Sequence, residues 1–96
     1  MEFIWRVNYF SALRVESLEG EFIVFQREAG KTHFLNEIGL KILSILDQSP
    51  ATLDSLCREL SEYFTLPPDT HFSAQINRTL QRYEALGLVS RVKENA

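Results

Sequence analysis

The sequence has a single cysteine, Cys57, so no disulfide can form within the chain. Reduced cysteine fits a reducing compartment, and we expect a cytoplasmic location. No apolar run approaches the roughly 18 residues that a membrane-spanning helix needs. The first residues, MEFIWRVNYF, lack the basic start and the apolar stretch of a secretory signal. The sequence therefore predicts neither a membrane span nor export.

The sequence is also poor in the residue patterns that build catalytic and metal centres. Its two histidines, His33 and His71, lie far apart, with no cysteine or histidine at metal-ligand spacing. No glycine-rich loop leads from a strand into a helix, so no phosphate-binding loop is visible. Cys57 shares a helical face with leucines, which favours a buried core thiol over a nucleophile. We therefore predict a protein that is not an enzyme, with no catalytic residue, no metal and no other cofactor.

Apolar residues, in contrast, are plentiful. They make up 45% of the 96 residues, and eleven residues are aromatic, which is too apolar for a disordered chain. A chain of this size can build one modest core, so we predict a single domain over residues 1–96. The formal net charge of −3 disfavours nucleic acid as a partner, because binding would require several phosphates to be neutralised.

The period of the hydrophobic pattern changes near Asn36. Before it, residues 3–9 alternate with a period of two, which is typical of a strand. Short extended segments rich in aromatic and β-branched residues follow at 22–25 and 32–35. We predict that residues 1–35 form a three-stranded antiparallel meander.

After Asn36 the pattern is helical. Asn36 and Thr52 can each cap a helix, and apolar residues recur three and four positions apart in three segments. The helices are separated at Ser49-Pro50 and at Pro67-Pro68, because proline cannot continue a helix. The third helix ends before a last short strand at residues 88–92.

These elements predict an α+β, winged-helix-like fold in which a three-stranded antiparallel sheet is followed by three helices and a short C-terminal strand. The core should consist of the apolar residues on the inward faces of these elements. The predicted core residues are Phe22 or Ile23, Leu35, Ile38, Ile42, Leu46, Leu56, Leu60, Ile76, Leu80 and Leu86.

One stretch, Thr32-His33-Phe34-Leu35-Asn36, follows a turn and leads directly into the first helix, and Asp47 lies near the end of that helix. With Trp5 near the start and Thr52-Leu53 opening the next helix, this order resembles the PqqD family. That family supplies the recognition element for precursor peptides in the biosynthesis of ribosomally made, modified peptides. The Thr32-His33-Phe34-Leu35-Asn36 sequence, with Trp5 near the start, is most similar to the PqqD-family peptide chaperones of bacterial HPr-kinase-related systems. Where the family has Asp-Gly, this chain has Asp47-Gln48, so the turn between the helices can differ.

The resemblance implies that a precursor or leader peptide is taken up as an added strand along Lys31 to Leu35, beside the third helix, and is presented to a modifying enzyme. An edge strand has unpaired backbone groups that can bind an extended peptide. Depending on register, Thr32 or His33 would face the groove, along with Phe34 or Leu35. The candidate peptide-binding residues are Lys31, Thr32, His33, Phe34, Leu35, Gln75, Arg78, Thr79 and Arg82.

The two arginines of this set have two interpretations. Arg78 and Arg82 can attract acidic residues of a peptide through charge-assisted hydrogen bonds. Alternatively, they form intrahelical or surface pairs, for instance with Glu84 or with an acidic residue of the second helix.

Two other functions stay open. A winged-helix DNA binder would place the third helix in the major groove, but the connection from Tyr63 to Phe72 is longer than the turn of a helix-turn-helix. A small oligomerisation domain would pair the edge Lys31 to Leu35 with its own copy, so a homodimer is an alternative partner. We favour peptide binding over DNA binding because of the net charge and the long connection.

Overall fold

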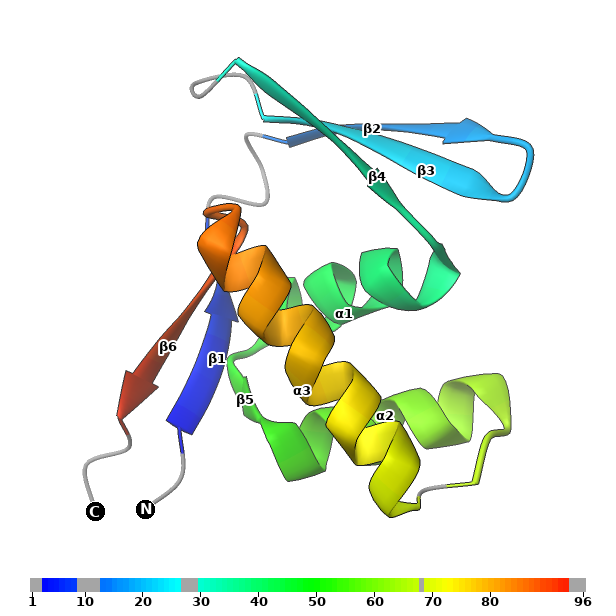
Figure 1. The fold of residues 1–96 in the computed structure, drawn as a ribbon, viewed down its shortest axis with the longest axis vertical. Helices are drawn as coiled ribbons and strands as arrows, with labels where there is room; N and C mark the ends of the chain where they lie inside the picture. Colours follow the sequence, from blue (N-terminus) through cyan, green and yellow to red (C-terminus); the bar gives the residue numbers. More distant parts are fainter. Residues whose placement is uncertain (1–2, 9–12, 27–29, 68, 94–96) are drawn as a thin grey trace.

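The computed structural model describes residues 3–8, 13–26, 30–67 and 69–93. Four strands come first, three helices with one short strand between them follow, and a strand ends the described chain (Figure 1). The predicted α+β fold is confirmed. The elements are β1 (Phe3–Val7), β2 (Leu13–Leu18), β3 (Glu21–Gln26), β4 (Lys31–Leu35), α1 (Glu37–Gln48), β5 (Ala51–Thr52), α2 (Leu53–Phe64), α3 (Thr70–Ala85) and β6 (Val89–Lys93).

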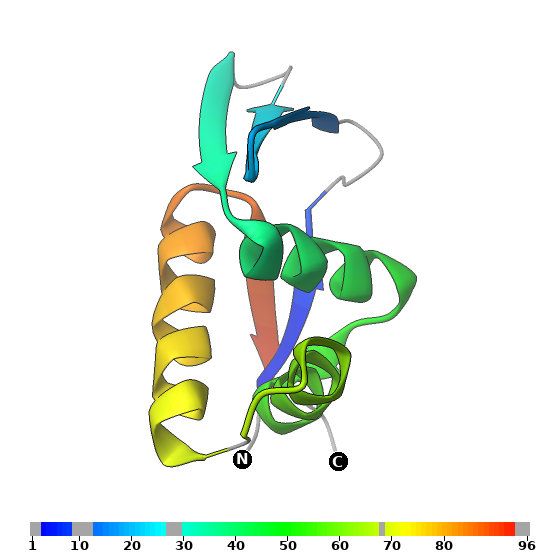
Figure 2. The same ribbon diagram turned by 90° about the vertical axis from the view of Figure 1, so that its right-hand side faces the viewer.

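The strands form two antiparallel sheets. The hairpin sheet has the order β2-β3-β4, and the terminal sheet has the order β5-β1-β6. Figure 2 shows the hairpin sheet above α1 and above the C-terminal end of α3, with β1 and β6 beside the helices. A three-stranded antiparallel meander therefore exists before the helices, as predicted, and a second sheet joins the two ends of the described chain.

The predicted membership of the meander was wrong in one strand. Of the segment predicted at residues 3–9, the described part β1 (Phe3–Val7) pairs with β6 and β5, where Trp5 lies opposite Arg91 and Ala51, and not with β3; Tyr9 lies outside the described residues. The first strand of the meander is β2, which was not predicted. Residues 14–17 of β2 are exposed on both faces of the sheet, so the strand has no alternation of apolar and polar residues to reveal it.

The helix boundaries follow from local chemistry. The side chains of Asn36, Thr52 and Asp69 cap α1, α2 and α3, each accepting a backbone N–H three residues on, at 2.8, 3.2 and 2.8 Å. Helix α1 ends at Ser49, whose backbone is extended (φ −164°, ψ 135°) and leads into Pro50 and β5. This exit needs no left-handed residue, which explains why the turn forms without a glycine after Asp47.

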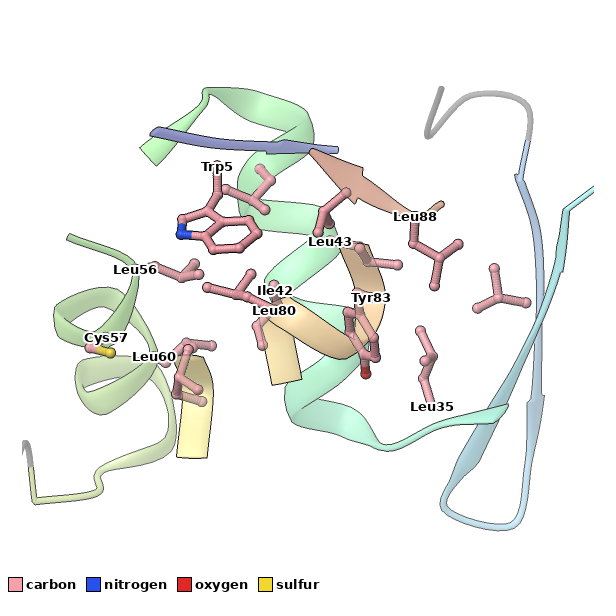
Figure 3. Packing of buried hydrophobic residues seen from close by; sticks show 14 of the residues in the cluster. Trp5, Leu35, Ile42, Leu43, Leu56, Cys57, Leu60, Leu80, Tyr83 and Leu88 are labelled. Atoms are coloured by element: carbon pink, nitrogen blue, oxygen red, sulfur yellow. The ribbon is translucent and has the colours of Figure 1, made fainter. Parts of the chain in front are cut away.

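The hydrophobic core lies where the helices meet the inner faces of both sheets (Figure 3). Most of the predicted core is confirmed, whereas Phe22, Ile38 and Leu86 are only partly buried against it. The predicted list omitted eight buried residues, four of which belong to β1, α3 and β6, namely Trp5, Phe72, Tyr83 and Val89. The buried hydrophobic residues are Trp5, Val24, Leu35, Ile42, Leu43, Leu46, Leu56, Cys57, Leu60, Phe72, Ile76, Leu80, Tyr83, Leu88 and Val89.

Helices α1 and α3 meet at a tyrosine and a glycine. The Tyr83 hydroxyl of α3 lies against Gly39 in the first turn of α1, and a Cβ at position 39 would collide with it. Burial raises the pKa of the Tyr83 hydroxyl, and the neighbouring Arg82 opposes this shift only in part. The absence of a side chain at position 39 therefore allows the two helices to approach closely.

A chain of hydrogen bonds joins the two sheets at the end of α3. The Nε2 atom of His33 in β4 lies 3.0 Å from Oε1 of Gln26, and Nε2 of Gln26 donates to the Gly87 carbonyl at 3.4 Å. The Asn8 side chain, which follows β1, donates to the same carbonyl at 3.2 Å. Because Gln26 uses its N–H on Gly87, its oxygen accepts from His33, which places the imidazole proton on Nε2.

The buried His33 predicts a pH dependence of stability. Burial, and to a lesser degree the charge of Lys31, lowers the pKa of His33. The unfolded chain therefore binds this proton more readily, so stability is full above the unfolded pKa of about 6.5 and decreases as the pH falls through it. Urea titrations at pH values from about 7.5 to about 5.5 should show a falling free energy of unfolding, and a smaller fall in His33→Gln.

The exposed His71 provides the matched control for this experiment, since it lies on the first turn of α3. The His71→Gln variant should retain the decline of the parent protein. A decline that is equally steep in His33→Gln would contradict the assignment to His33.

Core packing predicts the cost of truncating α3. Leu80 is fully buried, so Leu80→Ala should reduce the free energy of unfolding by about 2–5 kcal/mol through lost transfer energy and a residual cavity. Leu46→Ala should have an effect in the same range, because Leu46 is also buried. Denaturant titration measures both, with Tyr63→Ala as an exposed control. A loss below about 1 kcal/mol at Leu80 would show that this position is not tightly packed.

Cys57 should be unreactive in the folded protein. It is buried among core residues of α2, and burial raises the pKa of its thiol more than the hydrogen bond with Ser73 lowers it. A thiol reagent should therefore label Cys57 slowly in buffer and rapidly in denaturant. Equal rates under the two conditions would contradict burial, and labelling of Leu80→Ala should be faster than that of the parent protein.

Candidate functional site

β4 is an edge of the hairpin sheet. It pairs with β3 on one side, and no other strand of the described ranges pairs with it. His33 and Leu35 are buried toward the helices, whereas Thr32 and Phe34 point to the opposite face of the sheet, where Phe34 is 64% exposed. The structure therefore shows which side chains of β4 face the helices, which the sequence left open. The backbone groups on the free side of β4 are available to an extended segment.

A groove of about 320 Å³ lies directly after β4, between the start of α1 and one face of α3. Asn36 connects the groove to β4, because it is the residue between Leu35 and α1. Apolar side chains form the deeper part of the lining, and they are the buried or half-buried Ile38, Phe72, Ile76 and Tyr83. The α3 residues predicted from the sequence also line it, namely Gln75, Arg78, Thr79 and Arg82.

The structure thus brings the two halves of the predicted site side by side, but in different ways. The α3 half lines the groove with its side chains, whereas none of the five β4 side chains belongs to the lining. β4 can contribute its backbone edge and its exposed side chains. Asn36 and Ile38 also line the groove and were not predicted to do so, although their position directly after the strand was a usable signal.

The groove carries positive charge. Its lining contains Arg78 and Arg82 and no carboxylate. Among the residues that the structure describes, neither arginine forms an ion pair, and Glu84 instead lies 3.1 Å from Arg91. The guanidinium of Arg82 lies 5.6 Å from the centre of the Tyr83 ring. Both arginines are exposed and available to an anionic partner.

The groove is lined by apolar, amide, hydroxyl and guanidinium side chains. It contains no histidine, cysteine or carboxylate that could serve as nucleophile or general base. The Thr79 hydroxyl donates to the Gln75 carbonyl at 3.0 Å, within the helix itself. Over the described ranges, no group of three His, Cys, Asp or Glu side chains is placed to hold a metal ion. None of the helices described is long and apolar enough to cross a membrane.

Comparison with known proteins identifies the family. The family profile described as Coenzyme PQQ synthesis protein D (PqqD) matches residues 21–89, from the start of β3 to the first residue of β6. No curated protein and no solved structure matches the chain. The matched range includes β4, the start of α1 and α3, and so both walls of the groove. Since the match covers well over half of the sequence, the chain belongs to the PqqD family.

Proposed function

We propose that this protein binds a precursor or leader peptide as an added strand on β4 and presents it to a modifying enzyme. PqqD-family proteins are peptide-binding partners in the biosynthesis of ribosomally made, modified peptides. The observation that carries the proposal is the free edge of β4 directly beside the positively charged groove on α3.

The edge of β4 supplies binding that depends little on the peptide sequence. Alternate residues of an edge strand direct their N–H and C=O groups away from the sheet, and an extended peptide can pair with them. β4 is only five residues long, so backbone pairing covers a short segment of the peptide. Additional contacts are therefore needed for selectivity, and the adjoining groove is positioned to supply them.

The groove adds selectivity for acidic residues. Arg78 and Arg82 lie one helical turn apart on the same face of α3, so both can reach a chain that runs between α3 and β4. Guanidinium groups bind carboxylates through charge-assisted, often bidentate hydrogen bonds. The apolar residues beneath them, Ile38 and Ile76, can cover aliphatic parts of the peptide.

The DNA-binding alternative receives less support. A recognition helix must protrude to enter the major groove, whereas this face of α3 lines a recess together with Asn36 and Ile38. The formal net charge of −3 also opposes binding to phosphates. Peptide binding requires neither a protruding helix nor a broadly basic surface.

The groove predicts a charge-reversal effect. Arg82→Glu should weaken binding of an acidic leader peptide about fivefold at low salt, because exposed charge pairs contribute up to about 1 kcal/mol. The effect should shrink as salt is added, since exposed charges are screened. Titration of a synthetic acidic leader-type peptide, followed by fluorescence anisotropy at two salt concentrations, measures it.

Arg6→Glu is the matched control, because it makes the same charge change at an exposed residue of β1 that does not line the groove. The control variant should keep the affinity of the parent protein. In parallel, amide chemical shifts recorded during the titration should change at residues 31–35 and 75–82. Changes confined to β1 or α2 would contradict the proposed site.

A further inference from the structure

We infer that the hairpin sheet also reads the peptide on its outer face, the face turned away from the helices, and that Phe34 selects an apolar residue there. The inference rests on the proposed function, because it requires a peptide strand on β4. It defines the ligand as an extended segment with acidic residues toward α3 and an apolar residue beside Phe34.

The outer face of the hairpin sheet has an apolar strip. Ile23 lies opposite Phe34 and Phe25 lies opposite Thr32 in the β3–β4 pairing, so these side chains share one face. Ile23 and Phe25 are half-buried, and the Arg14 guanidinium lies 5.8 Å from the centre of the Phe25 ring. Phe34, at the free edge, is 64% exposed. The strip is therefore covered in part and open at the β4 edge.

The two ends of this strip differ in chemistry. On the β2 side, Ile23 is opposite Glu16, which forms an ion pair with Arg14 at 2.8 Å. On the β4 side, no strand of the described chain continues the row Glu16–Ile23–Phe34. The uncovered apolar surface is thus located at the edge where the peptide strand is proposed to bind.

Strand geometry links this surface to the α3 groove. A residue paired with Phe34 would point to the outer face, because side chains directly opposite each other in neighbouring strands share a face. Its two neighbours in the peptide would point toward the helices, since side chains alternate along a strand. These neighbours are the residues that can approach Arg78 and Arg82. Phe34 therefore selects an apolar residue at one position of the peptide, and Arg78 and Arg82 select acidic residues at the neighbouring positions.

Charge favours a peptide over a second copy of this chain as the occupant of the edge. If two β4 edges paired about a two-fold axis, the helices of both copies would lie on the same side of the joined sheet. The exposed arginines of both α3 helices would then flank one edge with like charge and with no carboxylate in either groove lining. An acidic peptide removes this repulsion.

The test uses two synthetic peptides long enough to span the five residues of β4. Both have glutamate at every second position, and the intervening positions are leucine in one peptide and serine in the other. The leucine peptide should bind the parent protein about fivefold more tightly, the effect expected for a cross-strand aromatic–aliphatic pair. Phe34→Thr should bind the two peptides with nearly equal affinity.

Tyr63→Thr is the matched control variant, because Tyr63 is also 64% exposed but lies near the end of α2. It should retain the preference for the leucine peptide. Threonine is well accommodated in strands, so Phe34→Thr should fold, and equal unfolding midpoints would confirm this. The comparison of the two peptides on the parent protein does not depend on any variant.

Each remaining outcome has a defined meaning. Equal affinity of the parent protein for both peptides would overturn the outer-face inference and leave the proposed function standing, provided that Arg82→Glu weakens both. If neither peptide binds, both the outer-face inference and the proposed function are overturned. Conversion of a dimer to a monomer by Phe34→Thr in sedimentation, with the leucine preference unchanged, would assign Phe34 to contact with a second copy and overturn the inference.

Discussion

The contact between Tyr83 and Gly39 sets the distance between α3 and the start of α1, and the groove depends on that distance. Tyr83 and Asn36 both line the groove, and Asn36 also caps α1 by accepting the Gly39 N–H. A side chain at position 39 would collide with the Tyr83 hydroxyl and separate the helices. One close approach therefore determines both the packing of α1 on α3 and the shape of the adjoining surface.

The hairpin sheet is anchored to the rest of the molecule through contacts that do not involve its free edge. Leu35 and Val24 insert into the core, and His33 reaches the Gly87 carbonyl through Gln26. These contacts use the inner face of β4, so its outer face and its backbone edge stay accessible. Burial on one face of a strand leaves its hydrogen-bonding edge unaffected, which allows β4 to be anchored to the core and available for pairing at once.

Sequence patterns predicted the helices well and the sheets less well. Caps at Asn36 and Thr52 and the proline breaks define the helices locally, because the groups involved are only a few residues apart. Alternation at residues 3–9 likewise predicts a strand, but it does not name the partner strand. The pairing of Trp5 with Arg91 joins distant parts of the chain and results from the packing of the whole core.

The candidate site divides in the same way. The sequence by itself determined the family resemblance, the strand that leads into α1, and the polar face of α3 with Arg78 and Arg82, because these depend on residue order and helical spacing. Only the tertiary structure decided that Glu84 pairs with Arg91, that His33 is buried, and that Phe34 is exposed at a free edge. The physical reason is that ion pairing, burial and strand pairing depend on which distant segments come into contact. Those contacts are determined by the packing of both sheets against the helices.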